Sequence, residues 1–461
     1  MGESIGVIAD DLTGACDTGL QFNVKGITTR IVLDYTDLNL PNTLAKGPQN
    51  FIVNTNSRHV EELDAVAAVR KSLRFLVQQA NTGLFYKKMD STLRGHVAQE
   101  CLAMIEELDC KAAIVAPAYP GEGRRTVGGY QLVRGLPVEQ SDVARDPLFP
   151  VFQSHLPTLL GNQSDPELVG YVPLKTVLSG AGPILKALQT LVREDKKLIV
   201  VDACSDTDLE QLALALSKMP EDSPVLPCGS AGLAKALTDK WVITDDEAEE
   251  ATFHIPTQPF LMVIGSVSAT TQLQLHTFMD TYNEYLKTNT AVALVELTAS
   301  QILGLDSTDA VIHQMDTALS QGKSVVLTAA YQPDAVKKAS ALAAEHDIEM
   351  NRASQYTTEC LGALTRAIRQ RHNVHLIMSG GETHWPCAGP LGAKSLQVVD
   401  RLSASIPLLV DDNGTWMVTS PAASAKNHPA RYRQHPGGTG SACCRQIKPP
   451  NTPYTHARFD S

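Results

Sequence analysis

The sequence predicts an α/β protein made of two α/β domains with mainly parallel sheets and an interdomain cleft. The chain has 461 residues, which is more than one ordinary hydrophobic core accommodates. Short apolar runs alternate with longer amphipathic stretches, a pattern typical of βαβ units. Its 43% hydrophobic and 19% charged residues are usual for a globular protein. These observations favour two successive α/β domains, and a cleft between such domains is a common place for a ligand.

The N-terminal domain is expected over residues 1–237. It opens with the apolar run 5–8, which reads as a buried strand. Further apolar runs predict strands at 31–33, 51–53, 84–86, 112–115 and 198–202. The amphipathic stretches between them predict helices at 61–79, 95–108 and 206–217. This alternation indicates a mainly parallel sheet.

The acidic stretch 238–259 lacks clear periodicity and is interpreted as a linker. A second α/β domain is expected over 260–419, with strands at 260–264, 291–297, 324–328, 374–378 and 415–419 and a helix at 354–370. Residues 420–461 differ in composition, since Ile447 is their only Leu, Ile, Val or Met and they hold six prolines. They also carry six Lys or Arg and one acid, Asp460. Such a tail has too little apolar area to offset its ordering entropy, so we expect it to be poorly packed.

Charge and composition exclude several classes of function. A net charge of -11 argues against a nucleic-acid-binding protein. No apolar run approaches the ~20 residues that a membrane-spanning helix requires, and no secretory signal is evident at the start. The nine cysteines show no Cys-x-x-Cys pair. We therefore expect reduced thiols and a cytoplasmic protein without nucleic-acid or membrane partners.

Asp10 and Asp11 follow the first strand directly, and Thr13-Gly14 then begins a helix. Ligands of open α/β sheets bind at the carboxyl ends of strands, so two carboxylates and a helix N-terminus meet where a polar ligand is expected. The ordinary explanation is a helix N-cap beside a solvated acid, because Asp is a preferred cap. Two acids followed by Thr-Gly favour a functional role.

Two more polar loops follow strands of the same domain. Residues 87–95 (Lys-Lys-Met-Asp-Ser-Thr-Leu-Arg-Gly) offer ammonium, carboxylate, hydroxyl and guanidinium groups. Residues 54–58 (Asn-Thr-Asn-Ser-Arg) form the third loop. Each loop alone could be an ordinary exposed connection. Together with Asp10 and Asp11 they predict a pocket for a small anionic polyol.

The C-terminal domain has two loops of small residues after strands. One is 265–268 (Gly-Ser-Val-Ser) and the other is 379–383 (Ser-Gly-Gly-Glu-Thr). Free backbone N–H groups in such loops can approach phosphates closely, especially before a helix. A tight turn is the ordinary explanation of either loop, but the pair in one domain favours a phosphate site.

The sequence resembles the four-carbon acid sugar kinase family. The resemblance rests on residues 9–14, 54–58, 88–95, 144–147, 229–233 and 379–383 and extends from about residue 5 to 419. It implies a sugar-acid-binding N-terminal domain and a nucleotide-binding C-terminal domain. The implied reaction is ATP-dependent phosphorylation of threonate, erythronate or 3-oxo-tetronate at the terminal hydroxyl, with ATP and Mg²⁺ as cosubstrate and metal.

The roles that this reaction suggests are expectations for particular residues. Asp10 or Asp11 orients the terminal hydroxyl and can deprotonate it, with Asp11 favoured for direct contact. The substrate-binding set is Asp11, Arg58, Lys88, Asp90, Ser91, Thr92 and Arg94. The ATP-binding set is Ser266, Ser268, Gly380, Gly381, Glu382 and Thr383. The metal ligands, the stereochemistry of the substrate and the oligomeric state stay open, and a homodimer is compatible with the sequence.

The chain departs from the family after residue 419, where members usually have Lys-x-Gly-x-Phe-Gly. Deleting one A from the lysine codon of ACC-AAG-TCC-GGC-GGC-TTC-GGC-AAA changes Thr-Lys-Ser-Gly-Gly-Phe-Gly into Thr-Ser-Pro-Ala-Ala-Ser-Ala, the residues at 419–425. We hypothesise that the tail is translated out of the ancestral frame. The alternative function is therefore a non-catalytic sugar-acid-binding relic of a kinase with an impaired ATP site. A dinucleotide-dependent oxidoreductase is disfavoured because no Gly-x-Gly-x-x-Gly follows the first strand.

Overall fold

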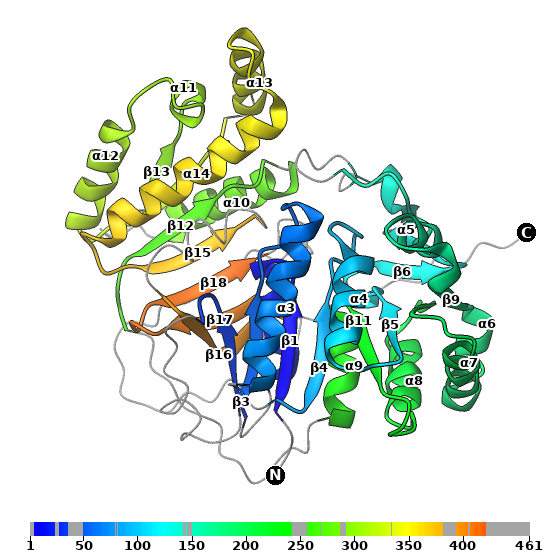
Figure 1. Cartoon of the computed structure of the whole chain (residues 1–461). Helices are drawn as coiled ribbons and strands as arrows, with labels where there is room; N and C mark the ends of the chain where they lie inside the picture. The colour runs from blue at the N-terminus through cyan, green and yellow to red at the C-terminus, as the bar shows by residue number, and fades with distance from the viewer. Residues whose placement is uncertain are drawn as a thin grey trace, which may run out of the picture. The chain divides into compact units, whose positions relative to one another are not determined.

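The computed structural model describes residues 4–23, 27–35, 49–78, 80, 82–141, 144, 150–241, 256–267, 269–285, 292–332, 334–380, 393–403 and 406–420. The predicted α/β class is confirmed, because most neighbouring strands are parallel and helices connect them (Figure 1). Within the described residues, no helix combines the length and apolar character that crossing a bilayer requires.

The N-terminal series forms eight adjacent parallel strands. In spatial order these are β2 (Thr28–Val32), β3 (Gln49–Asn54), β1 (Ile5–Ala9), β4 (Leu84–Lys88), β11 (Val225–Gly229), β5 (Ala112–Ala116), β10 (Leu198–Val201) and β9 (Val169–Val172). The helices on one side include α3 (Glu62–Gln78), α4 (Val97–Glu107) and α5 (Leu156–Asn162). The other side carries α1 (Leu12–Phe22), α6 (Leu174–Val177), α7 (Ala181–Arg193), α8 (Asp206–Leu216) and α9 (Ala231–Trp241). The fully buried apolar strands therefore lie between two helical layers, as expected for a parallel sheet.

The second series adds five parallel strands and two antiparallel ones. The parallel strands are β13 (Val292–Glu296), β14 (Ser324–Thr328), β12 (Phe260–Ile264), β15 (His375–Ser379) and β18 (Trp416–Ser420), which follows beside β15. Its helices are α10 (Ala269–Tyr285), α11 (Ala299–Ile302), α12 (Asp309–Ser320), α13 (Ala335–Glu345) and α14 (Met350–Arg369). The strands predicted in this half are confirmed to within one or two residues.

Two strands that were not predicted join the two series. β17 (Ile406–Asp411) runs antiparallel to β18, and β16 (Ser395–Ser403) runs antiparallel to both β17 and β2. As a result all fifteen strands belong to one sheet. Arg30 of β2 supports this junction, since its Nη1 donates to Ser395 Oγ at 3.2 Å.

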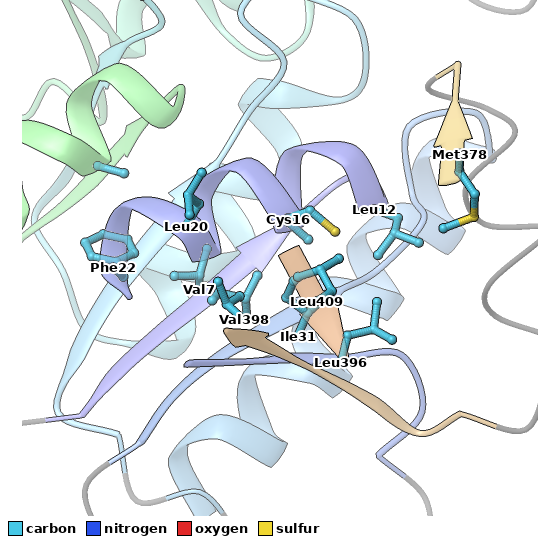
Figure 2. Packing of buried hydrophobic residues seen from close by; sticks show 14 of the residues in the cluster. Val7, Leu12, Cys16, Leu20, Phe22, Ile31, Met378, Leu396, Val398 and Leu409 are labelled. Atoms are coloured by element: carbon cyan, nitrogen blue, oxygen red, sulfur yellow. The ribbon is translucent and has the colours of Figure 1, made fainter. Parts of the chain in front are cut away.

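Helix α1 packs against this junction as well as against its own half. Figure 2 shows Leu12 and Cys16 of α1 above Leu396 of β16 and Leu409 of β17. A Cβ on Gly19 would lie 3.3 Å from Val398 Cγ2, so the helix approaches β16 closely. Because α1 begins directly after Asp11, both halves of the sheet hold that residue in place.

A small antiparallel sheet was also missed. It consists of β6 (Arg124–Val127), β7 (Tyr130–Val133) and β8 (Leu136–Pro137). Gly128 and Gly129 form its first turn with φ of 63° and 77°, as a two-residue type I′ hairpin requires. The Gly-Gly dipeptide, flanked directly by Val127 and Tyr130, was the signal that could have predicted it.

Two predicted boundaries shift slightly. Helix α9 continues to Trp241, which stacks on Phe22, so the first four residues of the predicted linker are helical. Ser420, the first residue of the predicted tail, still pairs with Ser379 in the sheet. Residues 242–255 of the linker and 421–461 of the tail lie outside the described residues.

Candidate active site

Asp11 is the N-cap of α1, so the structural role expected for an acid at this position is confirmed. Its Oδ1 accepts a hydrogen bond from the Gly14 backbone N–H at 2.9 Å. However, Asp11 is buried, as is Asp10 beside it. Neither residue is therefore the solvated acid that a purely structural explanation requires.

Both acids bind one arginine from the neighbouring strand end. Arg58 Nε donates to Asp10 Oδ2 at 2.8 Å, and its Nη1 donates to Asp11 Oδ2 at 2.9 Å. Arg58 Nη2 also lies 2.7 Å from Asp11 Oδ1. Burial would raise the pKa of Asp10, but the charges of Arg58, Lys87 and Lys88 outweigh burial and lower it. Asp10 is thus held as a carboxylate.

Lys88 approaches the first turn of α1 from β4. A Cβ on Gly14 would lie 2.6 Å from Lys88 Nζ and 2.5 Å from Asp11 Oδ1. Lys88 Nζ also donates to the Met89 carbonyl at 2.7 Å. Because Gly14 has no side chain, the Lys88 ammonium and the Asp11 carboxylate can both lie against the N-terminus of α1.

This close approach predicts opposite effects for two Gly→Ala substitutions in helices. Gly14→Ala should destabilise the protein by about 1–3 kcal/mol, because its methyl must displace Lys88 or Asp11. Gly182→Ala in α7 is the matched control, since a Cβ there meets nothing within 4 Å. That change should stabilise by roughly 0.5–1 kcal/mol. Denaturant unfolding of both variants measures this, and equal stabilisation by both would contradict the described packing.

The loop after β4 is arranged around Asp90. Its Oδ2 accepts hydrogen bonds from Thr92 Oγ1 at 2.5 Å and from Arg94 Nε at 2.6 Å. Burial would raise the pKa of Asp90, but Arg94 and Arg58 hold it well below its usual range. Ser91 is buried, and its carbonyl accepts from Gln131 Nε2 of β7 at 2.7 Å. The small sheet that was missed therefore supports this loop.

A hydrogen-bonded chain lies among the same strand ends. Lys87 Nζ is 2.6 Å from Glu100 Oε2 of α4, and Ser57 Oγ donates to Glu100 Oε1 at 2.6 Å. Ser57 Oγ is in turn 2.8 Å from Thr55 Oγ1. Burial would lower the pKa of Lys87, but Glu100 and Asp10 raise it. Sequence reasoning missed Glu100, because one acid in the first turn of a helix is ordinarily a solvated residue.

All the residues predicted to bind the sugar acid thus lie at one edge of the sheet, on the ends of β1, β3 and β4. These strands are adjacent and parallel, so their carboxyl ends meet. The arrangement also shows what the sequence could not: Arg58 and Arg94 each hold a carboxylate of the chain. The site is a network of paired charges around a helix N-terminus.

The residues predicted to bind ATP are described only in part. Ser266 follows β12, and its Oγ lies 2.9 Å from Thr271 Oγ1. Gly380 follows β15 with φ of 113°, a conformation that favours glycine. The two loops start side by side, since Gly265 N–H donates to the Ser379 carbonyl at 3.1 Å. Ser268, Gly381, Glu382 and Thr383 lie outside the described residues.

Neither metal ligands nor surface grooves define the candidate site further. In the part of the chain that is described, no group of three or more His, Cys, Asp or Glu could hold a metal ion. Two surface grooves of about 560 and 330 Å³ flank β9, and none of the predicted site residues lines either. The interdomain cleft stays a prediction.

Comparison with known proteins identifies the family. A model described as a sugar-binding N-terminal domain matches residues 5–237, and one described as a nucleotide-binding C-terminal domain matches 261–442. A D-threonate kinase of Salmonella typhimurium is 30% identical over 404 residues, covering 87% of this chain and 89% of that protein. A D-erythronate kinase of Heliobacterium modesticaldum is 35% identical over 300 residues, covering 63% of each chain. A 3-oxo-tetronate kinase of Cupriavidus necator is 24% identical over 413 residues, covering 88% of this chain and 90% of that protein.

Solved structures share the fold. A Salmonella typhimurium protein superimposes with a TM-score of 0.73 at 21% identity, covering 93% of this chain and 97% of that one. A Haemophilus influenzae protein does so with a TM-score of 0.65 at 21% identity, covering 91% and 97%. Fold, motifs and relatives agree: the chain belongs to the four-carbon acid sugar kinase family and is a phosphotransferase with an alcohol group as acceptor.

Proposed function

We propose that this protein transfers the terminal phosphoryl group of ATP to the terminal hydroxyl of a four-carbon sugar acid: threonate, erythronate or 3-oxo-tetronate. The names of the kinase relatives support the substrate class. The observation that carries the proposal is the buried network in which Arg58 holds Asp10 and Asp11 at the N-terminus of α1. Such paired charges can orient a hydroxylated anion without reorganising during the reaction.

The proposed roles follow the two halves of the chain. Residues 1–237 bind the sugar acid, with Lys88, Asp90, Ser91, Thr92 and Arg94 around it. Residues 260–419 bind ATP through the loops at 266–268 and 380–383. The sugar-binding and nucleotide-binding models that match these regions support this division. Mg²⁺ enters with ATP as part of the substrate.

Asp10 and Asp11 are the residues that we assign to the chemical step. Phosphoryl transfer depends mainly on positioning and on neutralising charge. Asp11 orients the terminal hydroxyl and accepts its proton, while Arg58 keeps both carboxylates in place. Asp10 is the second candidate for the base, since Arg58 binds its carboxylate as well.

The alternative is a relic that binds the sugar acid without catalysis. It is favoured by the sequence after β18, which lacks the Lys-x-Gly-x-Phe-Gly that family members usually have there. The match of the nucleotide-binding model extends to residue 442, beyond this point. The frameshift hypothesis stays a proposal, and resequencing the gene tests it. A read in which no single-base change restores Lys-Ser-Gly-Gly-Phe-Gly would exclude it.

A thermal-shift panel on the full chain separates the kinase from the relic. A ligand that binds only the folded state stabilises it by about 2.7 kcal/mol at a concentration 100 times Kd. The kinase should be stabilised by Mg-ATP and by at least one of the three sugar acids. Stabilisation by a sugar acid alone would favour the relic, and no response to any of the acids would contradict the proposal. The homodimer stays a prediction, which light scattering on the same samples tests.

A further inference from the structure

The polar network continues along α1 beyond Lys88. Asp17 lies three residues after Gly14 and therefore shares its face of the helix. Lys88 Nζ lies against Gly14 on this face, and its charge acts on Asp17. Asp17 is thus the next charged group along the helix after the Asp11 and Lys88 pair.

Arg124 lies in the segment that follows the carboxyl end of β5. The chain turns through a short 3₁₀ helix, and the ends of this turn pair as an antiparallel bridge. Tyr119 N–H donates to the Arg124 carbonyl at 2.9 Å, and Arg124 N–H donates to the Tyr119 carbonyl at 3.1 Å. The turn brings Arg124 close enough for its charge to act on Asp17.

Both side chains carry a buried polar atom without a hydrogen-bond partner. These atoms are Asp17 Oδ1, an acceptor, and Arg124 Nε, a donor. Leaving such an atom unpaired costs about 1–3 kcal/mol, so in native structures it is usually paired with a bound group or an ordered water. Burial raises the pKa of Asp17 to about 7, against the lowering effect of Lys88 and Arg124 and with Glu122 adding to the rise.

The other two arginines at this edge differ in this respect. Arg58 Nε donates to Asp10, and Arg94 Nε donates to Asp90. Their guanidinium groups are engaged with carboxylates of the chain, whereas Nε of Arg124 is not. A hydroxy acid carries the two groups that would satisfy the unpaired atoms, because its carboxylate accepts and its hydroxyl donates.

We infer that Arg124 binds the carboxylate of the substrate and that Asp17 accepts a hydrogen bond from one of its hydroxyls. The inference rests on the proposed function and adds to it. It assigns the carboxylate contact to Arg124 and leaves Arg58 to hold Asp10 and Asp11. Arg124 then determines the preference for an acid over a neutral polyol, and Asp17 contributes equally to the binding of both.

Titration of the full chain with acids and with their neutral counterparts tests this inference. D-threonate and D-erythronate are compared with threitol and erythritol by calorimetry. Arg124→Gln should lower the affinity for the acid that the wild type binds by about 10- to 100-fold. It should also remove the preference for that acid over the corresponding tetritol. Arg125→Gln is the matched control, because Arg125 is exposed, follows Arg124 on β6 and donates to the Cys204 carbonyl at 3.0 Å. It should bind as the wild type does.

Two further variants keep the test decisive. Arg124→Lys retains the positive charge and replaces Arg124→Gln in the test if that variant does not fold. It should lose part of the preference for the acid over the tetritol. Asp17→Asn should lower the affinities for the acid and for the tetritol to the same extent, so the ratio of the two affinities should stay unchanged. Acid binding by Arg124→Gln at the wild-type affinity would overturn the inference alone. A wild type that binds neither these two acids nor 3-oxo-tetronate would overturn the proposed function as well.

Discussion

Asp11→Asn should lower kcat by about 10²- to 10⁴-fold while the protein stays folded. Asparagine is as good an N-cap as aspartate, so the bond to the Gly14 N–H survives. Asp10 still pairs with Arg58, which keeps the guanidinium in place. On the proposed assignment, what the variant loses is the carboxylate that accepts the proton of the terminal hydroxyl.

Steady-state kinetics with the preferred sugar acid, together with thermal unfolding, measures this prediction. Asp10→Asn is the comparison, because it removes the other carboxylate of the same pair; its effect on kcat should be smaller. Unchanged turnover in Asp11→Asn would refute the assignment of Asp11. A large loss in Asp10→Asn alone would transfer the role to Asp10.

Arg58→Met should destabilise the folded state by about 3–5 kcal/mol, because it leaves two buried carboxylates without their cation. Arg70→Met is the control, since Arg70 forms exposed ion pairs with Glu106 and Glu107. That change should cost less than about 1 kcal/mol. Denaturant unfolding at pH 7 compares the two variants.

The stability lost in Arg58→Met should return partly as the pH falls. In the wild type, Arg58 is a main cause of the lowered pKa of Asp10, so Asp10 contributes stability above its unfolded pKa. Without Arg58 the effect of burial is less opposed, and the variant gains stability when its carboxyls are protonated. Adding Asp10→Asn to the variant should recover part of the loss at pH 7. A deficit that is independent of pH and unchanged in the double variant would contradict the ion-pair explanation.

The strands and the edge at which they meet could be predicted because the signals are local. Apolar runs place β1, β4 and β12, and the polar residues directly after them must lie at the carboxyl ends of the strands. The N-cap role of Asp11 was also one of two explanations available from the residue type.

The partners of these residues could not be predicted, because they depend on which strands become neighbours. Nothing near Arg58 in the sequence indicates that its Nε donates a hydrogen bond to Asp10, 48 positions away. β16 pairs with β2 across more than 360 residues, and its mixed pattern has no clear period. Arg124 was overlooked for the same reason, since its turn after β5 lies far from Asp17 of α1 in the sequence.

The central claim is tested most directly by a coupled assay of ADP release with Mg-ATP and each of the three sugar acids, with the product examined by mass spectrometry. The account predicts turnover with at least one acid, a product heavier by one phosphoryl group, and formation of that product at a rate about 10²- to 10⁴-fold lower in Asp11→Asn. ADP release that is independent of every acid, or no phosphorylated product from any of them, would contradict it.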